Sequence, residues 1–199
     1  MIDRRFMLQG GLTTMLAGGL QPSIAAAKEG LSDQTIIATA RRLLRENAAH
    51  ISKTDVVGIV DYTAPSARPR FHLVDMIKSR VSTLLVSHGR GSDPQHTGRL
   101  QHFSNEVGSN ASSYGAYCTD EQYVGKHGRS MRLVGLYPEN SNAMARAIVV
   151  HAAWYVGDEM VSKYGKLGRS EGCFAVSEAN LDAVLERLGP GRLLFSGKF

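Results

Sequence analysis

The chain carries a series of short, apolar, β-branched runs separated by stretches rich in Gly, Pro, Ser and Asn. Runs of roughly four to eight such residues between turn residues predict β-strands. We expect strands at 56–62, 70–76, 81–88, 114–119, 130–137, 147–156, 173–177 and 191–197. Many short strands with few helices predict a β-rich domain of the α+β class.

Three stretches have the spacing or the end signals of helices. Residues 33–50 place apolar side chains three and four positions apart, and Ser32 or Asp33 is suited to cap them. Residues 158–165 predict a short helix. A helix over 177–189 has Ser177 as its N-cap and Gly189 as its stop signal. The 199-residue length fits one domain, and residues 28–199 show no internal repeat or linker.

The first 27 residues have the features of an export signal. Arg4-Arg5 precedes a short, Gly-rich apolar run, and Ala25-Ala26-Ala27 offers a small-residue cleavage site. An arginine pair before such a run resembles twin-arginine signals, with the general secretory route as the alternative. A membrane anchor or a core helix would need a longer run with fewer glycines. We therefore expect export to the periplasm or cell envelope, with no membrane span left after cleavage.

The formal net charge of +5 comes mainly from residues 28–199, so it belongs to the folded domain. A basic domain is compatible with nucleic acid or an anionic envelope polymer as partner. No block of five like charges and no interleaved aromatic and basic stripe occurs in the sequence. This pattern argues against nucleic acid as a partner.

Cys118 and Cys173 are the chain's two cysteines. Cys173 follows a Ser-x-Gly turn and precedes the apolar run 174–176, as expected for a thiol held at the start of a strand. A nucleophilic thiol needs a base, and His151 ends an apolar run upstream. A neighbouring imidazolium would lower the thiol pKa, and Gly172 would admit a substrate carbonyl. A Cys118–Cys173 disulfide remains the alternative interpretation, whereas with a nucleophilic Cys173 we expect Cys118 to be an inert buried thiol.

A second group of polar residues lies in the long, aperiodic stretch 89–113 and the residue before it. His88, Asp93, His96 and His102 are side-chain types that bind zinc. No His-x-His or His-Glu-x-x-His pattern occurs in the sequence, and a loop offers no rigid element to fix tetrahedral geometry. We therefore predict no metal site, and expect this loop to border a groove with His88 at a strand end.

Two segments carry a family resemblance. "IVVHAAWYV" followed by "LGRSEGCFAV" resembles the His and Ser-x-Gly-Cys elements of the L,D-transpeptidase catalytic domain (YkuD type), and in particular its murein L,D-transpeptidase subgroup. "VSHGRGSD", "SSYGAYCT" and residues 131–156 are similar to that subgroup too, so the resemblance covers roughly 30–199. It implies an L,D-transpeptidase-like β-sandwich or barrel.

The resemblance also implies roles for particular residues. Cys173 would be the nucleophile, His151 the base, Ser170 and Gly172 the residues that shape the site, and amides near Cys173 the oxyanion hole. The histidine would be oriented by a backbone carbonyl. Familiar members carry an arginine where this chain has Ala175, so charge must come from elsewhere. We expect Arg169 and the further binding candidates His88, Arg90 and Arg132 to supply substrate contacts.

These residues together predict an exported cysteine L,D-transpeptidase that acts on peptidoglycan stem peptides and uses no cofactor. The thioacyl-enzyme would end either as a cross-link or by L,D-carboxypeptidase trimming, and the sequence leaves both fates open. Two alternatives remain at this point. One is a zinc-dependent murein peptidase that uses the histidines at 88–102, and the other is a non-catalytic envelope-binding domain with a Cys118–Cys173 disulfide.

Overall fold

The computed structural model describes residues 31–199. The predicted export signal at residues 1–27 lies outside the described residues. Eight strands form one sheet, and three α-helices and two short 3-10 turns accompany it. Their bounds are α1 Asp33–Glu46, β1 Val56–Asp61, β2 Phe71–Asp75, β3 Arg80–Leu84, η1 Arg90–Ser92, β4 Gly115–Gly125, β5 Gly128–Gly135, η2 Pro138–Asn140, β6 Val149–Ala152, α2 Asp158–Tyr164, β7 Phe174–Val176, α3 Glu178–Leu188 and β8 Leu193–Gly197.

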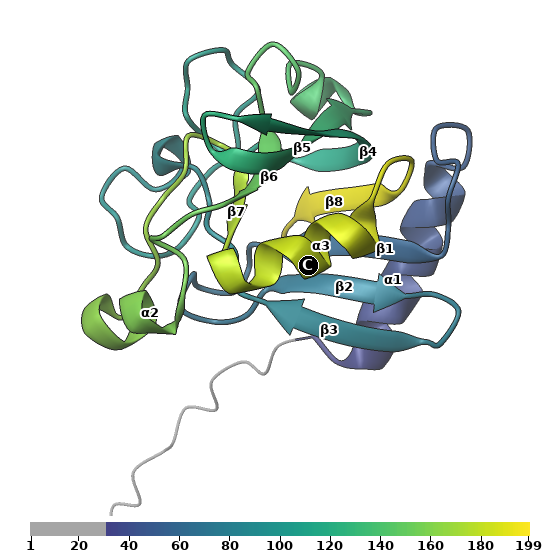
Figure 1. Ribbon diagram of the computed structural model, residues 1–199, viewed down its shortest axis with the longest axis horizontal. Helices are drawn as coiled ribbons and strands as arrows, with labels where there is room; N and C mark the ends of the chain where they lie inside the picture. Colours follow the sequence, from purple (N-terminus) through teal and green to yellow (C-terminus); the bar gives the residue numbers. More distant parts are fainter. Residues whose placement is uncertain (1–30) are drawn as a thin grey trace, which may run out of the picture.

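The strand order is β3-β2-β1-β8-β4-β5-β6-β7 (Figure 1). Neighbours pair antiparallel except for two parallel pairs, β1 with β8 and β6 with β7. The parallel pair β6–β7 is made possible by the long connection through α2, because parallel neighbours need a crossover. This pair forms one end of the sheet.

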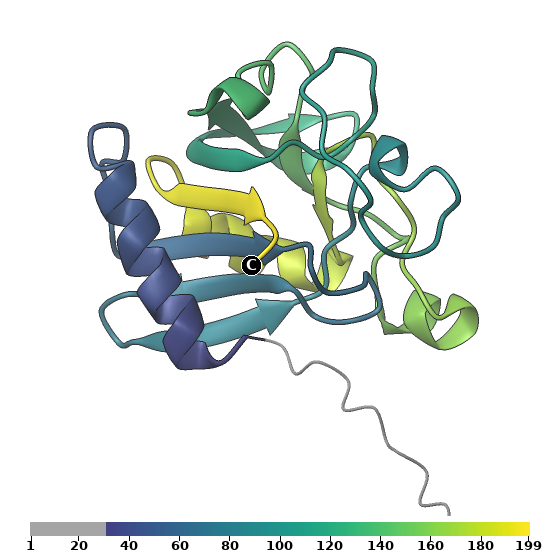
Figure 2. The same cartoon turned by 180° about the vertical axis from the view of Figure 1, so that it is seen from behind.

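Two helices cover opposite faces of the half of the sheet that contains β1, as the views from front and back show (Figures 1 and 2). Alternate residues of β1 point to opposite faces. Val57 and Ile59 pack in the cluster that contains Ile36 and Leu43 of α1, whereas Val60 packs in the cluster that contains α3. The near-continuous burial of β1 follows from this double cover.

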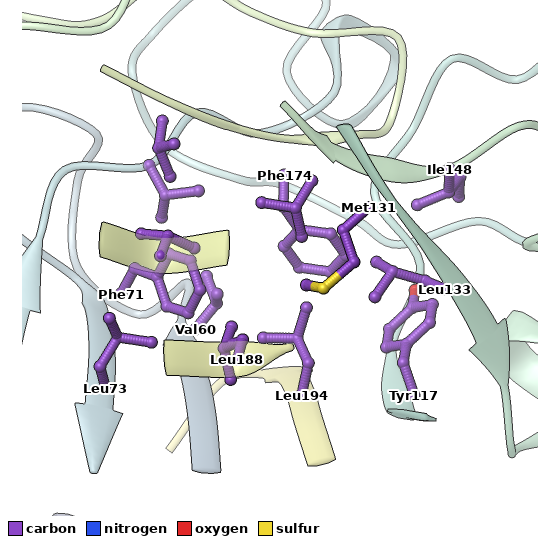
Figure 3. Close-up of a cluster of buried hydrophobic side chains, with 14 of the residues drawn as sticks. Val60, Phe71, Leu73, Tyr117, Met131, Leu133, Ile148, Phe174, Leu188 and Leu194 are labelled. Atoms are coloured by element: carbon purple, nitrogen blue, oxygen red, sulfur yellow. The ribbon is translucent and has the colours of Figure 1, made fainter. Parts of the chain in front are cut away.

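The larger core cluster extends from α3 to the strand that follows Cys173 (Figure 3). Phe174 of β7 is 1% exposed, and its ring meets that of Tyr117 edge-on with centroids 5.4 Å apart. Met131 and Leu133 of β5 complete the packing around it. Burying a side chain of this size contributes about 1.5–3 kcal/mol to the free energy of unfolding. The packing of Phe174 therefore fixes the position of Cys173, the residue directly before it.

The predicted fold class is confirmed: the chain is β-rich, with an N-terminal helix and few others. The predicted bounds fail at several element ends: the helix expected at 33–50 ends at Glu46, and the strand expected at 81–88 ends at Leu84. The strand expected at 114–119 runs on to Gly125 and forms a hairpin with β5, and the strand expected at 147–156 stops at Ala152. Among residues 31–199, none of the helices has the length and apolar character that a membrane crossing requires.

Candidate active site

Cys173 and His151 come from the two parallel strands at the end of the sheet. Cys173 directly precedes β7, and His151 lies on β6, whose register pairs it with Ala175. Both side chains line one cavity of about 330 Å³. The structure therefore brings together the two residues that the sequence separates by a helix and its turns.

His151 is oriented by the backbone, since its Nδ1 lies 2.8 Å from the carbonyl oxygen of Ala152. A carbonyl only accepts, so Nδ1 carries the proton and donates it. Burial lowers the pKa of His151, partly offset by this hydrogen bond, and the positive neighbours His127 and Lys126 lower it further. A neutral imidazole in this tautomer leaves Nε2 free to accept a proton.

The Cys173 thiol is 8% exposed and donates to the carbonyl oxygen of Ala147 at 3.6 Å. Burial raises the pKa of this thiol above its usual range, while a backbone hydrogen bond from Val149 and the charge of Arg146 lower it in part. We expected an imidazolium to lower the thiol pKa. The structure instead indicates a neutral thiol and a neutral imidazole on the same cavity, because desolvation disfavours both charged forms.

A tight turn presents Cys173 to the cavity. Ser170 Oγ donates to the Cys173 carbonyl at 2.7 Å and accepts from the Gly172 amide at 3.2 Å, which closes the turn on itself. Gly172 has φ of +113°, and a Cβ there would lie 2.7 Å from the Ala111 carbonyl oxygen. Glycine is therefore needed for the backbone itself, a different reason from the substrate access that the sequence suggested.

The cavity wall is strongly cationic. Arg90, Lys126, Arg146 and Arg169 line it, and Glu171 is the one acidic residue in that lining. Glu171 pairs with Arg90 at 3.1 Å, both at the exposed rim. Such a wall attracts a carboxylate or another anion.

Arg146 is a lining residue that the sequence reasoning did not single out. Its guanidinium donates to the Ser104 carbonyl at 2.7 Å, to Ser113 Oγ at 2.5 Å and to the Ala111 carbonyl. These contacts tie the long 89–113 loop to the segment that precedes β6. Arg146 lies five positions before His151, inside the segment 131–156 that resembles the family. This position is the sequence feature that could have identified it as a lining residue.

The β4–β5 hairpin supplies further lining residues that the sequence reasoning missed. Tyr123, Lys126 and His127 reach the cavity, and Tyr155 does so from beyond β6. The His127 ring stacks on that of His151, with centroids 4.4 Å apart and planes at 25°. A second imidazole therefore covers the proposed base.

The family model for the L,D-transpeptidase catalytic domain matches residues 27–196. The chain belongs to the L,D-transpeptidase catalytic domain family. The search of curated protein sequences finds no match for it. The match includes the turn, both strands and the loop described above.

Several solved structures are similar to this chain at low sequence identity. An L,D-transpeptidase from Mycobacterium smegmatis shares 13% identity at a TM-score of 0.44, covering 71% of this chain and 58% of that one. The helical cell shape determining protein Pgp2 from Campylobacter jejuni shares 11% sequence identity at a TM-score of 0.46. The alignment covers 81% of this chain and 55% of that one. L,D-transpeptidase 3 from Mycobacterium tuberculosis, with a faropenem-derived adduct, shares 16% sequence identity at a TM-score of 0.38. The alignment covers 72% of this chain and 60% of that one. The aligned part is thus less than two thirds of each of those chains.

His88 does not line the cavity of this L,D-transpeptidase domain, contrary to our expectation. Its side chain is 1% exposed, because it turns inward between Arg70 and Asp93. Its backbone carbonyl instead accepts from the Ser170 amide at 2.9 Å. His88 therefore supports the turn before Cys173 from behind, and its buried side chain is not among the residues that line the cavity.

Arg132 also stays out of the cavity lining. Its guanidinium pairs with Glu121 at 2.8 Å and lies 4.3 Å from the centre of the Tyr123 ring. Arg90 and Arg169 do line the cavity as expected. Arg169 is held by the carbonyls of Asp93 and Pro94, so the 89–113 loop also fixes this cation.

The 88–102 histidines do not converge in this domain. His88 is bonded to Arg70 and Asp93, His96 Nε2 lies 2.8 Å from the Leu167 carbonyl, and His102 is exposed. Within the described part of the chain, no three His, Cys, Asp or Glu side chains are grouped as metal ligands require. Cys118 and Cys173 are both free thiols, so the structure also contains no disulfide between them.

Proposed function

We propose that this chain is an exported cysteine L,D-transpeptidase that acts on peptidoglycan stem peptides. The observation that carries the proposal is the juxtaposition of Cys173 and a neutral, carbonyl-oriented His151 on one cationic cavity, in a chain of this family. Export rests on the arginine pair and small-residue site within residues 1–27.

Acylation begins with proton transfer from the thiol to the free Nε2 of His151. The sulfur attacks the carbonyl of the L-centre residue that precedes a terminal D-amino acid. The Gly172 amide already donates to Ser170 Oγ, so we assign the developing oxyanion to the amide of Cys173 itself. When the C–N bond breaks, the imidazolium returns its proton to the departing amine, and a thioester remains on Cys173.

The cationic wall suits the carboxylate of the departing D-amino acid. Arg146 lies close to the turn before Cys173, since a Cβ on residue 172 would lie 3.0 Å from its Nη2, and its charge lowers the pKa of the thiol in part. Its guanidinium matches a carboxylate in shape and charge. The same wall would lower the affinity for substrates with a cationic chain end.

The thioester is then resolved by an amine from another stem, which gives a cross-link, or by water, which trims the peptide. In both cases His151 accepts the proton of the incoming nucleophile. Whether the thioester yields a cross-link or a trimmed peptide depends on whether an acceptor amine displaces water from the cavity.

Incubation with a carbapenem followed by intact mass measurement tests this function. A single adduct is expected, located on Cys173 and lost in Cys173→Ala. Cys118→Ala is the matched control, since it removes the other thiol and should keep the adduct. An adduct absent from the wild type, or still present in Cys173→Ala, would contradict the proposal.

A further inference from the structure

A second cavity of about 550 Å³ lies beyond the carboxyl ends of β6 and β7. Trp154 and Tyr164 line it together with the first turns of α2 and α3. None of the residues assigned above to the chemistry reaches this cavity, so the proposed acyl transfer leaves it without a role.

Two adjacent aromatic residues of the chain line the two cavities, one each. Trp154 lines the second cavity, whereas Tyr155 lines the catalytic cavity. Their rings meet edge-on with centroids 5.8 Å apart. A ligand bound along both cavities would therefore cross this pair of rings.

Trp154 is an open aromatic platform. Its side chain is 77% exposed, although a tryptophan is usually largely buried. Tyr164 is 52% exposed, but the ammonium of Lys163 lies 5.2 Å from the centre of its ring. Trp154 is thus the ring available for stacking. An exposed Trp of this kind is typical of a binding surface.

The charges of the two cavities are opposite. Asp158, Glu159 and Glu178 line the second cavity, with Lys163 as its one cation. Carboxylates accept hydrogen bonds from hydroxyl groups and repel anions. A flat aromatic face attracts the C–H groups of a sugar ring, because the face carries partial negative charge. A neutral, hydroxyl-rich sugar satisfies both surfaces at once.

We propose that this second cavity is a subsite for the glycan part of the substrate, in which a neutral sugar stacks on Trp154. The inference rests on the proposed function, because the sugar is taken to belong to the same molecule as the stem peptide. Trp154 lies three positions after His151, at most about 10 Å of extended chain. Three extended peptide residues span a similar length, so a sugar a few residues from the attacked carbonyl would reach the ring.

The chain contains a single tryptophan, so its fluorescence reports on this cavity alone. Chitotetraose, a neutral glycan, should change the Trp154 emission saturably, and trilysine should have a smaller effect. Tyr164→Phe, which keeps the ring, and Tyr164→Ala, which removes it, show whether the second ring contributes. No change with chitotetraose, or an equal or larger response to trilysine, would overturn the glycan assignment.

Kinetics on two donors separate this inference from the proposed function. The ratio of kcat/KM for a disaccharide-linked stem peptide to that for the free peptide should fall about tenfold in Trp154→Ala. Ile77→Ala, which truncates an equally exposed apolar side chain on the β2–β3 turn, should keep the ratio. A ratio unaltered in Trp154→Ala overturns the subsite while the function stands. A wild type inactive on both donors overturns the function, and the fluorescence titration still decides the subsite.

Discussion

Lowering the pH should destabilise the fold through His88, which is buried behind the catalytic turn. Arg70 Nη2 donates to His88 Nδ1 at 2.8 Å, and His88 Nε2 lies 3.2 Å from Asp93 Oδ2. Nδ1 accepts and Nε2 donates, so the ring is neutral. Burial, followed by the charge of Arg70, lowers the pKa of His88 to about 4, although Asp93 acts in the opposite direction.

The sign of the effect follows from where each state binds a proton. An unfolded histidine titrates near pH 6.5, so between pH ~6.5 and ~4 the unfolded chain binds a proton that folded His88 does not. The free energy of unfolding therefore falls as the pH drops through this window. At pH 5 the loss relative to pH 7 is about 2 kcal/mol, a large part of a typical stability of about 5–15 kcal/mol.

His88→Gln isolates this contribution, because a glutamine can accept from Arg70 and donate to Asp93 but does not titrate. Urea unfolding at pH 7 and pH 5 should show a smaller loss in His88→Gln than in wild type, by about 2 kcal/mol. His102→Gln removes an exposed histidine and should behave like wild type. If wild type and His88→Gln lose the same free energy of unfolding between pH 7 and pH 5, the assignment of His88 as a neutral, buried imidazole is wrong.

Three further changes test the site. His127→Ala should move the acid limb of kcat/KM to higher pH, since it removes a positive charge and a stacked ring that lower the pKa of His151; an unmoved limb would show that the stack is incidental. Gly172→Ala should cost about 1–3 kcal/mol of stability in thermal or urea unfolding, because its φ is positive and the Ala111 carbonyl is close; a wild-type stability would exclude this strain. Cys118→Ala should leave activity per folded molecule intact and lower stability by roughly 1 kcal/mol, and a loss of turnover would give this thiol a role.

The β-rich class could be predicted because it depends on local patterns, whereas the pairing of Cys173 with His151 was expected from the family resemblance of the segments that carry them. Strand runs such as 56–62 are buried on both faces, so their apolar character is visible in the sequence. The β4–β5 hairpin was missed beyond Thr119 because its residues are mostly exposed and a register shift falls between Thr119 and Gln122. No apolar alternation marks such a segment, and with it Lys126 and His127 were missed.

Side-chain direction explains the misplaced binding residues. His88 was expected at the groove because it ends a strand run, but which way its ring points depends on Arg70, a residue far away in the sequence. Arg132 lies on a strand beside the hairpin, and its partner Glu121 is brought close only by the β4–β5 pairing. Contacts of this kind arise from tertiary structure and leave no trace in local spacing.

Ala175 stands at the position where the family resemblance led us to expect an arginine. Ala175 is fully buried and packs with Ala153, Val156 and Leu167, so an arginine would not fit there without displacing that cluster. Arg146 brings a guanidinium to the cavity from the segment before β6 instead, and a Cβ on residue 172 would lie 3.0 Å from its Nη2. The small residue at 175 and the glycine at 172 are therefore two conditions for the same arrangement. One lets the strand pack, and the other leaves space for Arg146 and the Ala111 carbonyl beside the turn before Cys173.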